Sequence, residues 1–247
     1  MPRLLINDKE YSPKLILFDV DGTLVDDTHR YSSLGKARYT VFKEMASENA
    51  ANEWARLTGV NPSGWTIDPS GPISKAPRRD DLALAAGALY LDSYNWYEAR
   101  SLAEKIYMKA DADQKRNFKP QLYEGVEAKL RELKTAGFTL GVATNGVTEI
   151  TEELLTGLGI SDLFSVVVGA DLVENSKPAP EMILLACKKA GHEASESMYV
   201  GDQPTDIEAA DNAHVMISLG VRNTDLTNRD GVEVLRSFNE IQIFKAP

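Results

Sequence analysis

The sequence contains very little cysteine and histidine. Cys187 is the single cysteine in 247 residues, so an internal disulfide and a cysteine-based zinc site are both excluded. The three histidines, His29, His192 and His214, are scattered and argue against a histidine-rich metal site. No apolar run approaches the roughly 20 residues of a membrane helix, and residues 1–13 lack the apolar core of a signal peptide. We therefore expect a cytoplasmic protein with no membrane contact.

Positive charge is also scarce. Lys and Arg total 27 against 37 Asp and Glu, which gives a net charge of −10. A general nucleic-acid binder needs a basic face to neutralise phosphates, so we expect no nucleic-acid partner. Hydrophobic residues make up 43% and charged residues 26% of the chain, as in an ordinary globular protein.

Five short apolar runs predict buried β-strands. They are almost continuously apolar rather than alternating, which is typical of strands covered on both faces. Helical patterns separate the last four runs, so the order predicts parallel βαβ units in a doubly wound sheet of the α/β class. The runs are residues 15–18, 138–143, 164–168, 198–200 and 215–219.

The segment between the first and second of these strands breaks the alternation. A crossover between parallel strands needs about a dozen residues, but this segment is several times longer and carries apolar residues at helical spacing. It predicts an inserted all-helical domain at residues 26–118, with residues 1–25 and 119–247 forming the α/β core. Within the insert, Thr58–Pro77 is rich in Gly and Pro. It is either a flexible surface loop or a loop that faces the substrate.

Polar residues follow four of the predicted strands. The carboxyl ends of parallel strands meet at one edge of an α/β sheet, where ligands bind, so these residues are expected to lie together. The segments are DVDGTL at 19–24, TN at 144–145, KPAPE at 177–181 and GDQPTD at 201–206. The first is not a calcium loop, because the twelfth position counted from Asp19 is Arg30 rather than Glu.

Each of these segments has a simple structural explanation when it is taken alone. Thr144 or Asn145 could cap the helix that follows, and Lys177 could lie on the surface. Asp202 could cap another helix, and Asp206 could complement its dipole. These explanations do not account for the arrival of all four segments at the same sheet edge.

The charge at this edge points to a metal ion. Four carboxylates and one lysine give a formal charge of −3, which would repel an anionic substrate unless a cation were present. Mg²⁺ is commonly held by one or two carboxylates together with substrate phosphate oxygens. The pattern therefore predicts a magnesium site.

The order DVDGTL, TN, KPAPE and GDQPTD resembles the haloacid dehalogenase (HAD) superfamily. Within it, the chain is most similar to the phosphatase branch that inserts a helical cap after the first motif, as in phosphoglycolate phosphatases. The resemblance covers about residues 14–24 and 121–220, whereas the cap matches only in position and helical character. It implies a Rossmann-like HAD core with an inserted all-helical cap domain that closes over the site.

The resemblance also implies roles for the residues that bind and transfer the phosphoryl group. Asp19 would be the nucleophile that forms an aspartyl-phosphate. Asp21 would protonate the leaving alcohol and then activate water. Thr144 and the backbone N–H of Asn145 would hold phosphate oxygens, and Lys177 would balance their charge.

A second group of residues would hold the metal. By the resemblance, Asp202 would bind Mg²⁺ together with Asp19 and the backbone carbonyl of Asp21. Asp206 would orient Asp202 or a bound water. Gln203 departs from the small hydroxyl residue that often follows the aspartate of this motif.

The resemblance thus implies a magnesium-dependent phosphatase for a small soluble phosphate monoester, and we expect a monomer or homodimer. Asp21 argues against a 2-haloacid dehalogenase, since a halide leaving group needs no proton. A phosphomutase of the same superfamily remains open, as does a non-catalytic binding protein. Phosphoglycolate, sugar phosphates and nucleotides all remain possible substrates. Candidate specificity residues in the insert are His29, Arg30, Arg38, Lys75, Arg78 and Arg79.

Overall fold

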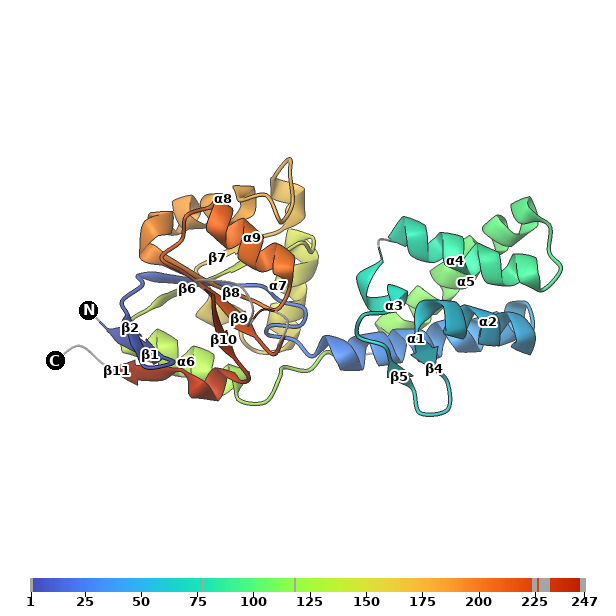
Figure 1. Ribbon diagram of the computed structural model, residues 1–247, viewed down its shortest axis with the longest axis horizontal. Helices are drawn as coiled ribbons and strands as arrows, with labels where there is room; N and C mark the ends of the chain where they lie inside the picture. Colours follow the sequence, from blue (N-terminus) through green and yellow to red (C-terminus); the bar gives the residue numbers. More distant parts are fainter. Residues whose placement is uncertain (1, 77, 118, 224–225, 227–231, 245–247) are drawn as a thin grey trace. The chain divides into compact units, whose positions relative to one another are not determined.

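The computed structural model describes residues 2–76, 78–117, 119–223, 226 and 232–244 (Figure 1). The chain divides into two compact units. One comprises Met1–Asp26 and Gln121–Pro247, and the other comprises Asp27–Pro120. Among the described residues, no helix is long and apolar enough to cross a bilayer.

The first unit is built on a six-stranded sheet in the order β10-β9-β8-β3-β6-β7. All of its strand pairs are parallel, which confirms the doubly wound α/β sheet predicted from the apolar runs. The central strand β3 is fully buried, as its unbroken apolar sequence requires. The bounds are β3 Leu15–Phe18, β6 Thr139–Ala143, β7 Val166–Val168, β8 Ser197–Gly201, β9 Ile217–Val221 and β10 Glu233–Leu235.

Helices cover both faces of this sheet (Figure 1). Alternate residues of β3 point to opposite sides: Ile16 and Phe18 pack with α6 and α7, whereas Leu15 and Leu17 pack with α8 and α9. The helices are α6 Val126–Ala136, α7 Thr148–Gly157, α8 Glu181–Ala190 and α9 Pro204–Asn212. Short 3-10 helices occur at Ser161–Leu163, Ala170–Leu172, Ala194–Glu196 and Phe238–Glu240.

A small antiparallel sheet joins the two ends of the chain in the first unit. Its order is β11-β1-β2, from β1 (Arg3–Ile6), β2 (Lys9–Tyr11) and β11 (Gln242–Phe244). Glu233 of β10 links it to the main sheet, because its carboxylate accepts hydrogen bonds from Asn7 at 2.9 Å, Lys9 at 2.7 Å and Tyr11 at 3.3 Å. None of the five apolar runs in the sequence predicts this sheet.

The second unit is a helical bundle with its own hydrophobic core. The segment expected to be a loop, Thr58–Pro77, contains an antiparallel ribbon and a short helix instead, while Pro77 itself lies outside the described residues. The elements are α1 Asp27–Met45, α2 Glu48–Thr58, β4 Val60–Asn61, β5 Thr66–Ile67, α3 Pro72–Lys75, α4 Arg78–Leu91 and α5 Trp96–Asn117.

A buried polar network connects α1, α2, α4 and α5. Arg38 is 4% exposed, and its guanidinium donates to the Asp81 carboxylate at 2.6 Å. The Tyr107 hydroxyl donates to the same carboxylate at 2.7 Å and accepts a hydrogen bond from Trp54 at 2.9 Å. The Arg38 guanidinium also stacks 4.0 Å from the Tyr107 ring centre. Arg38, a candidate specificity residue, is therefore buried and engaged in contacts inside the helical unit. The side chain of Lys75, another candidate, lies outside the described residues.

Candidate active site

The ends of β3 and β8 approach each other closely at the carboxyl edge of the main sheet. The Asp19 backbone N–H donates to the Val200 carbonyl at 2.9 Å, which fixes the first aspartate beside the fourth motif. Gly22 has a φ of +79°, and a Cβ there would lie 2.5 Å from Oδ2 of Asp202. A glycine is therefore required both by the backbone conformation and by the close approach of the Asp202 carboxylate.

Lys177 is the centre of a buried polar cluster. Its Nζ lies 2.7 Å from Oδ1 of Asp19, 2.5 Å from Oδ1 of Asp206 and 2.9 Å from the Tyr199 hydroxyl. An ammonium group has three N–H donors, and these contacts use all of them. The alternative explanation of Lys177 as an ordinary surface lysine does not apply, because only 7% of the residue is exposed.

Burial and charge act against each other on the ionisable groups of this cluster. Burial raises the pKa of Asp19 to about 6, although the Lys177 ammonium lowers it and the Asp206 carboxylate raises it further. Burial alone would lower the pKa of Lys177, but the negative charge of Asp19 and Asp206 holds it well above its usual range. Lys177 is therefore a permanent cation at neutral pH. Its charge partly offsets the carboxylates around it.

Tyr199 is a member of the cluster that sequence reasoning missed. Its hydroxyl donates to the Ala143 carbonyl at 2.7 Å while it accepts the hydrogen bond from Lys177. Its position in an apolar strand suggested an ordinary core residue. The signal that could have found it is the phenol itself, since a fully buried tyrosine hydroxyl needs a polar partner.

Asp206 holds both the lysine and the fourth motif. Its Oδ2 accepts hydrogen bonds from the backbone N–H groups of Asp202 at 3.1 Å and Gln203 at 2.9 Å. The Gln203 side chain in turn accepts a hydrogen bond from the Asp206 backbone N–H, and the contacts together form a capping box at the start of α9. Asp206 therefore serves the helix terminus and the Lys177 cluster together.

The Asp202 side chain is oriented by its neighbours. Oδ1 accepts a hydrogen bond from the Thr23 hydroxyl at 3.0 Å, and Oδ2 accepts one from the Gln203 side-chain amide. The Asn223 amide donates to the Asp202 backbone carbonyl at 2.8 Å. Gln203, the residue that departs from the family pattern, thus contacts the carboxylate directly.

Thr144 and Asn145 do not cap the helix that follows them. The N-cap of α7 is Val147, and no side chain caps it there. Oδ1 of Asn145 instead accepts the Lys177 backbone N–H at 3.1 Å, and Thr144 is 4% exposed at the end of β6. The structure therefore brings the second and third motifs together.

The carboxylates fit a hard divalent cation. Oxygen atoms of Asp19, Asp202 and Asp206 lie within 4.8 Å of one another, and all three residues are buried. The Asp206 carboxylate already accepts hydrogen bonds from two backbone N–H groups and from Lys177. Asp19 and Asp202 are therefore the better placed carboxylate ligands. A site with oxygen donors alone suits Mg²⁺ or Ca²⁺ rather than a soft metal.

Comparisons with known proteins agree with this geometry. The family model for haloacid dehalogenase-like hydrolases matches residues 13–214. Phosphoglycolate phosphatase of Yersinia pestis is 34% identical over 200 residues, which cover 80% of this chain and 76% of that protein. Probable phosphatase IndB of Dickeya dadantii is 29% identical over 232 residues, 92% of this chain and 91% of that protein. A HAD-superfamily hydrolase of subfamily IA from Geobacter sulfurreducens superimposes with a TM-score of 0.65 at 23% identity, covering 93% and 95% of the two chains.

Proposed function

This chain belongs to the haloacid dehalogenase-like hydrolases and is a phosphatase of that family, and we propose that it hydrolyses a small phosphate monoester through a phosphorylated Asp19. The observation that carries the proposal is the buried contact of 2.7 Å between Asp19 and Lys177, beside Asp202 and two residues before Asp21. This arrangement combines a carboxylate nucleophile, a fixed cation and a second carboxylate for proton transfer.

In the first half-reaction, a carboxylate oxygen of Asp19 attacks phosphorus. A bond forms between that oxygen and phosphorus, and the bond from phosphorus to the alcohol oxygen breaks. Asp21 in its protonated form gives its proton to the leaving oxygen, which then departs as the neutral alcohol. An alkoxide is a poor leaving group, so this proton transfer is the reason to assign a second aspartate to the reaction.

In the second half-reaction, water attacks the phosphorus of the aspartyl-phosphate. Asp21, now ionised, accepts a proton from the water as the new bond to phosphorus forms. The bond to Asp19 breaks and inorganic phosphate leaves. Both aspartates return to their starting states, so no other reactant is consumed.

Positioning and charge neutralisation account for most of the catalysis of phosphoryl transfer. We assign the phosphoryl oxygens to the Thr144 hydroxyl and the Asn145 backbone N–H. The Lys177 ammonium, whose N–H donors are engaged by Asp19, Asp206 and Tyr199, would balance the charge of these oxygens from its place beside Asp19. Asp19 and Asp202, with the backbone carbonyl of Asp21, would hold Mg²⁺. When bound, the ion supplies positive charge next to the transferring group.

The relatives suggest where to begin the search for a substrate. Several, including those from Yersinia pestis and Salmonella typhi, are named phosphoglycolate phosphatases, so 2-phosphoglycolate is the first compound to test. We also propose that the helical unit, Asp27–Pro120, acts as the cap that selects the substrate.

The test is release of inorganic phosphate from a panel of 2-phosphoglycolate, sugar phosphates and nucleoside monophosphates. We expect turnover with Mg²⁺, and almost none in EDTA or with Ca²⁺, whose larger coordination number misplaces Asp19 for attack. Full activity in EDTA would refute the metal assignment. Isomerisation of a sugar phosphate without phosphate release, stimulated by a bisphosphate, would show that the protein is a mutase.

A further inference from the structure

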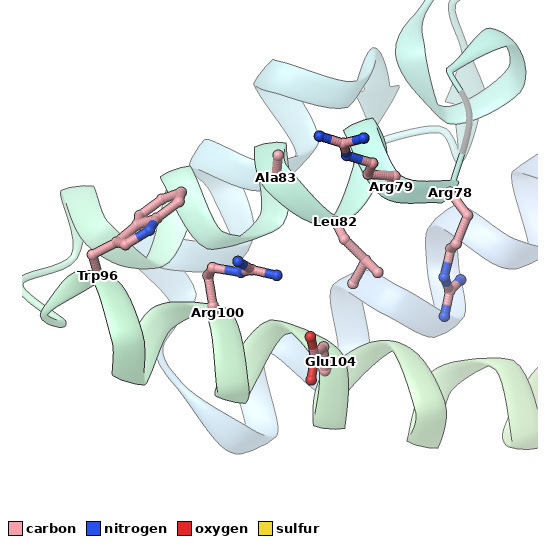
Figure 2. Close-up of a pocket in the computed structure, with 7 residues that line it drawn as sticks. All are labelled: Arg78, Arg79, Leu82, Ala83, Trp96, Arg100 and Glu104. Atoms are coloured by element: carbon pink, nitrogen blue, oxygen red, sulfur yellow. The ribbon is translucent and has the colours of Figure 1, made fainter.

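A groove between α4 and α5 of the helical unit takes no part in the proposed chemistry. It encloses about 570 Å³, within the range of roughly 300–1,000 Å³ typical of small-molecule sites. Figure 2 shows the Arg100 side chain projecting from α5 toward α4 and the Arg79 side chain lying along α4, with Trp96 at one end and Arg78 at the other. The lining residues are Arg78, Arg79, Leu82, Ala83, Trp96, Arg100 and Glu104.

The groove concentrates positive charge in an acidic protein. Three arginines and one glutamate line it, although the chain has a net charge of −10. Arg78 is paired with Asp111 at 2.7 Å. Within the described part of the chain, Arg79 and Arg100 have no ion pair, Glu104 included. Two guanidinium groups are therefore available to a ligand.

The wall of the groove formed by Arg78 is held by the buried network beneath it. The Arg78 guanidinium lies 4.7 Å from the centre of the Tyr107 ring. That ring also contacts Arg38 at 4.0 Å, and its hydroxyl is fixed by Asp81. A wall that is ordered before binding loses little conformational entropy when a ligand arrives.

Trp96 offers a different kind of contact. Its side chain is 45% exposed at the start of α5, one turn before Arg100. An exposed indole in a groove is suited to stacking with a planar ring, and arginine is suited to bidentate contact with phosphate oxygens. The groove thus presents an aromatic surface and two phosphate donors on one helix pair.

We propose that this groove binds a nucleotide, with the base against Trp96 and the phosphate between Arg79 and Arg100. The proposal is independent of the phosphatase function. Two unpaired arginines are too few to track a polynucleotide, whose binding depends on neutralising many phosphates. A free nucleotide therefore fits the groove better than RNA.

The test is calorimetric titration of the full-length Asp19→Asn protein with AMP, adenosine and inorganic phosphate in EDTA, where the proposed nucleophile and metal are absent. Arg79→Gln with Arg100→Gln removes both donors without shortening the helices. Arg56→Gln, an exposed arginine on α2 paired with Glu53, is the matched control for lost charge. Loss of charged hydrogen bonds predicts AMP binding at least about tenfold weaker in the double variant and unchanged in the control.

Trp96→Ala separates the two halves of the ligand. It should weaken AMP binding by about tenfold and leave phosphate binding unchanged, because stacking concerns the base alone. The proposal is overturned if AMP does not bind, or if it binds equally to the parent and the double arginine variant, which would place it at the Asp19 cluster. It is also overturned if adenosine binds as tightly as AMP, or if single-stranded polyuridylate binds and AMP does not.

Discussion

Replacing Tyr199 by phenylalanine removes a single hydroxyl group from the centre of the buried cluster. The ring and its packing remain, so the substitution isolates the hydrogen bond from Lys177 at 2.9 Å and the bond to the Ala143 carbonyl at 2.7 Å. Tyr199 does not touch the reacting atoms in the proposed mechanism. We assign it as a positioning residue that holds the Lys177 ammonium against Asp19.

The size of the effect follows from these contacts. A hydrogen bond to a charged group contributes about 1.5–3 kcal/mol, and about 1.4 kcal/mol corresponds to a tenfold change in rate. Asp19 and Asp206 still hold Lys177 in the variant, so the lower end of this range applies. We expect kcat to fall about tenfold, with KM changed by less than about twofold.

The assay is steady-state release of phosphate at a temperature well below the unfolding midpoint, together with inhibition by orthovanadate. Vanadate resembles the transferring phosphoryl group, so its affinity should fall by the same factor as kcat/KM. Tyr11→Phe is the control, because it removes a hydroxyl that donates to Glu233 in the same unit, away from Lys177. Unchanged kcat and vanadate affinity in a folded Tyr199→Phe protein would refute the positioning role, as would a higher KM at constant kcat.

Three further substitutions test other parts of the structure. Asp21→Asn should lower turnover of alkyl esters by about 10²–10⁴-fold. It should slow aspartyl-phosphate formation from p-nitrophenyl phosphate much less, as measured by the burst of nitrophenol. An equal loss of activity on both esters would contradict the acid–base role of Asp21. Gly22→Ala should abolish activity, because the new Cβ would lie 2.5 Å from the Asp202 carboxylate. The control is Gly191→Ala, which is also at positive φ but in open space and should cost only about 1 kcal/mol of stability. Full activity in Gly22→Ala would contradict the close approach of Asp202. Burial would raise the pKa of Glu233, but hydrogen bonds from Lys9 and Asn7 outweigh this effect and lower the pKa below the ordinary value of 4.5. The ionised Glu233 therefore adds to the free energy of unfolding above pH 4.5, and this contribution is lost as the pH falls through the folded-state pKa. Glu233→Gln should therefore reduce the free energy of unfolding by about 1–3 kcal/mol at pH 7, with a gap that closes in acid; a gap independent of pH in urea titrations would show that ionisation of Glu233 contributes nothing.

The main sheet could be predicted from sequence because its strands are buried on both faces. Burial of β3 between two helical layers demands an unbroken apolar run, and Leu15–Phe18 provides one. The motifs were found for a related reason, since each follows such a run. The three-stranded sheet could not be found in this way. It pairs Arg3 with Phe244, and short strands from opposite ends of a chain leave no local signal.

Contacts between side chains that are far apart in the sequence explain the remaining differences between the sequence-based predictions and the structure. The sequence offers Arg38 as one candidate specificity residue, but its guanidinium pairs with Asp81, which lies 43 residues away in the sequence. The apolar run around Tyr199 predicts only a core residue, and the fold brings its hydroxyl to Lys177. Thr144 was a candidate helix cap, but the helix begins at Thr148, whose backbone N–H donates to Asp171 at 2.7 Å. Sequence patterns indicate which residues are buried, whereas these contacts depend on the packing of distant elements.

The proposed mechanism requires Asp19 to carry the phosphoryl group during turnover. The most direct measurement is mass spectrometry of the acid-quenched Asp21→Asn protein after mixing with p-nitrophenyl phosphate and Mg²⁺. Loss of the base that activates water should let the intermediate accumulate. We predict that the peptide containing Asp19 gains the mass of one phosphoryl group, and that Asp19→Asn shows neither the adduct nor turnover. A phosphoryl group on another residue, or parent-like turnover by Asp19→Asn, would contradict the account.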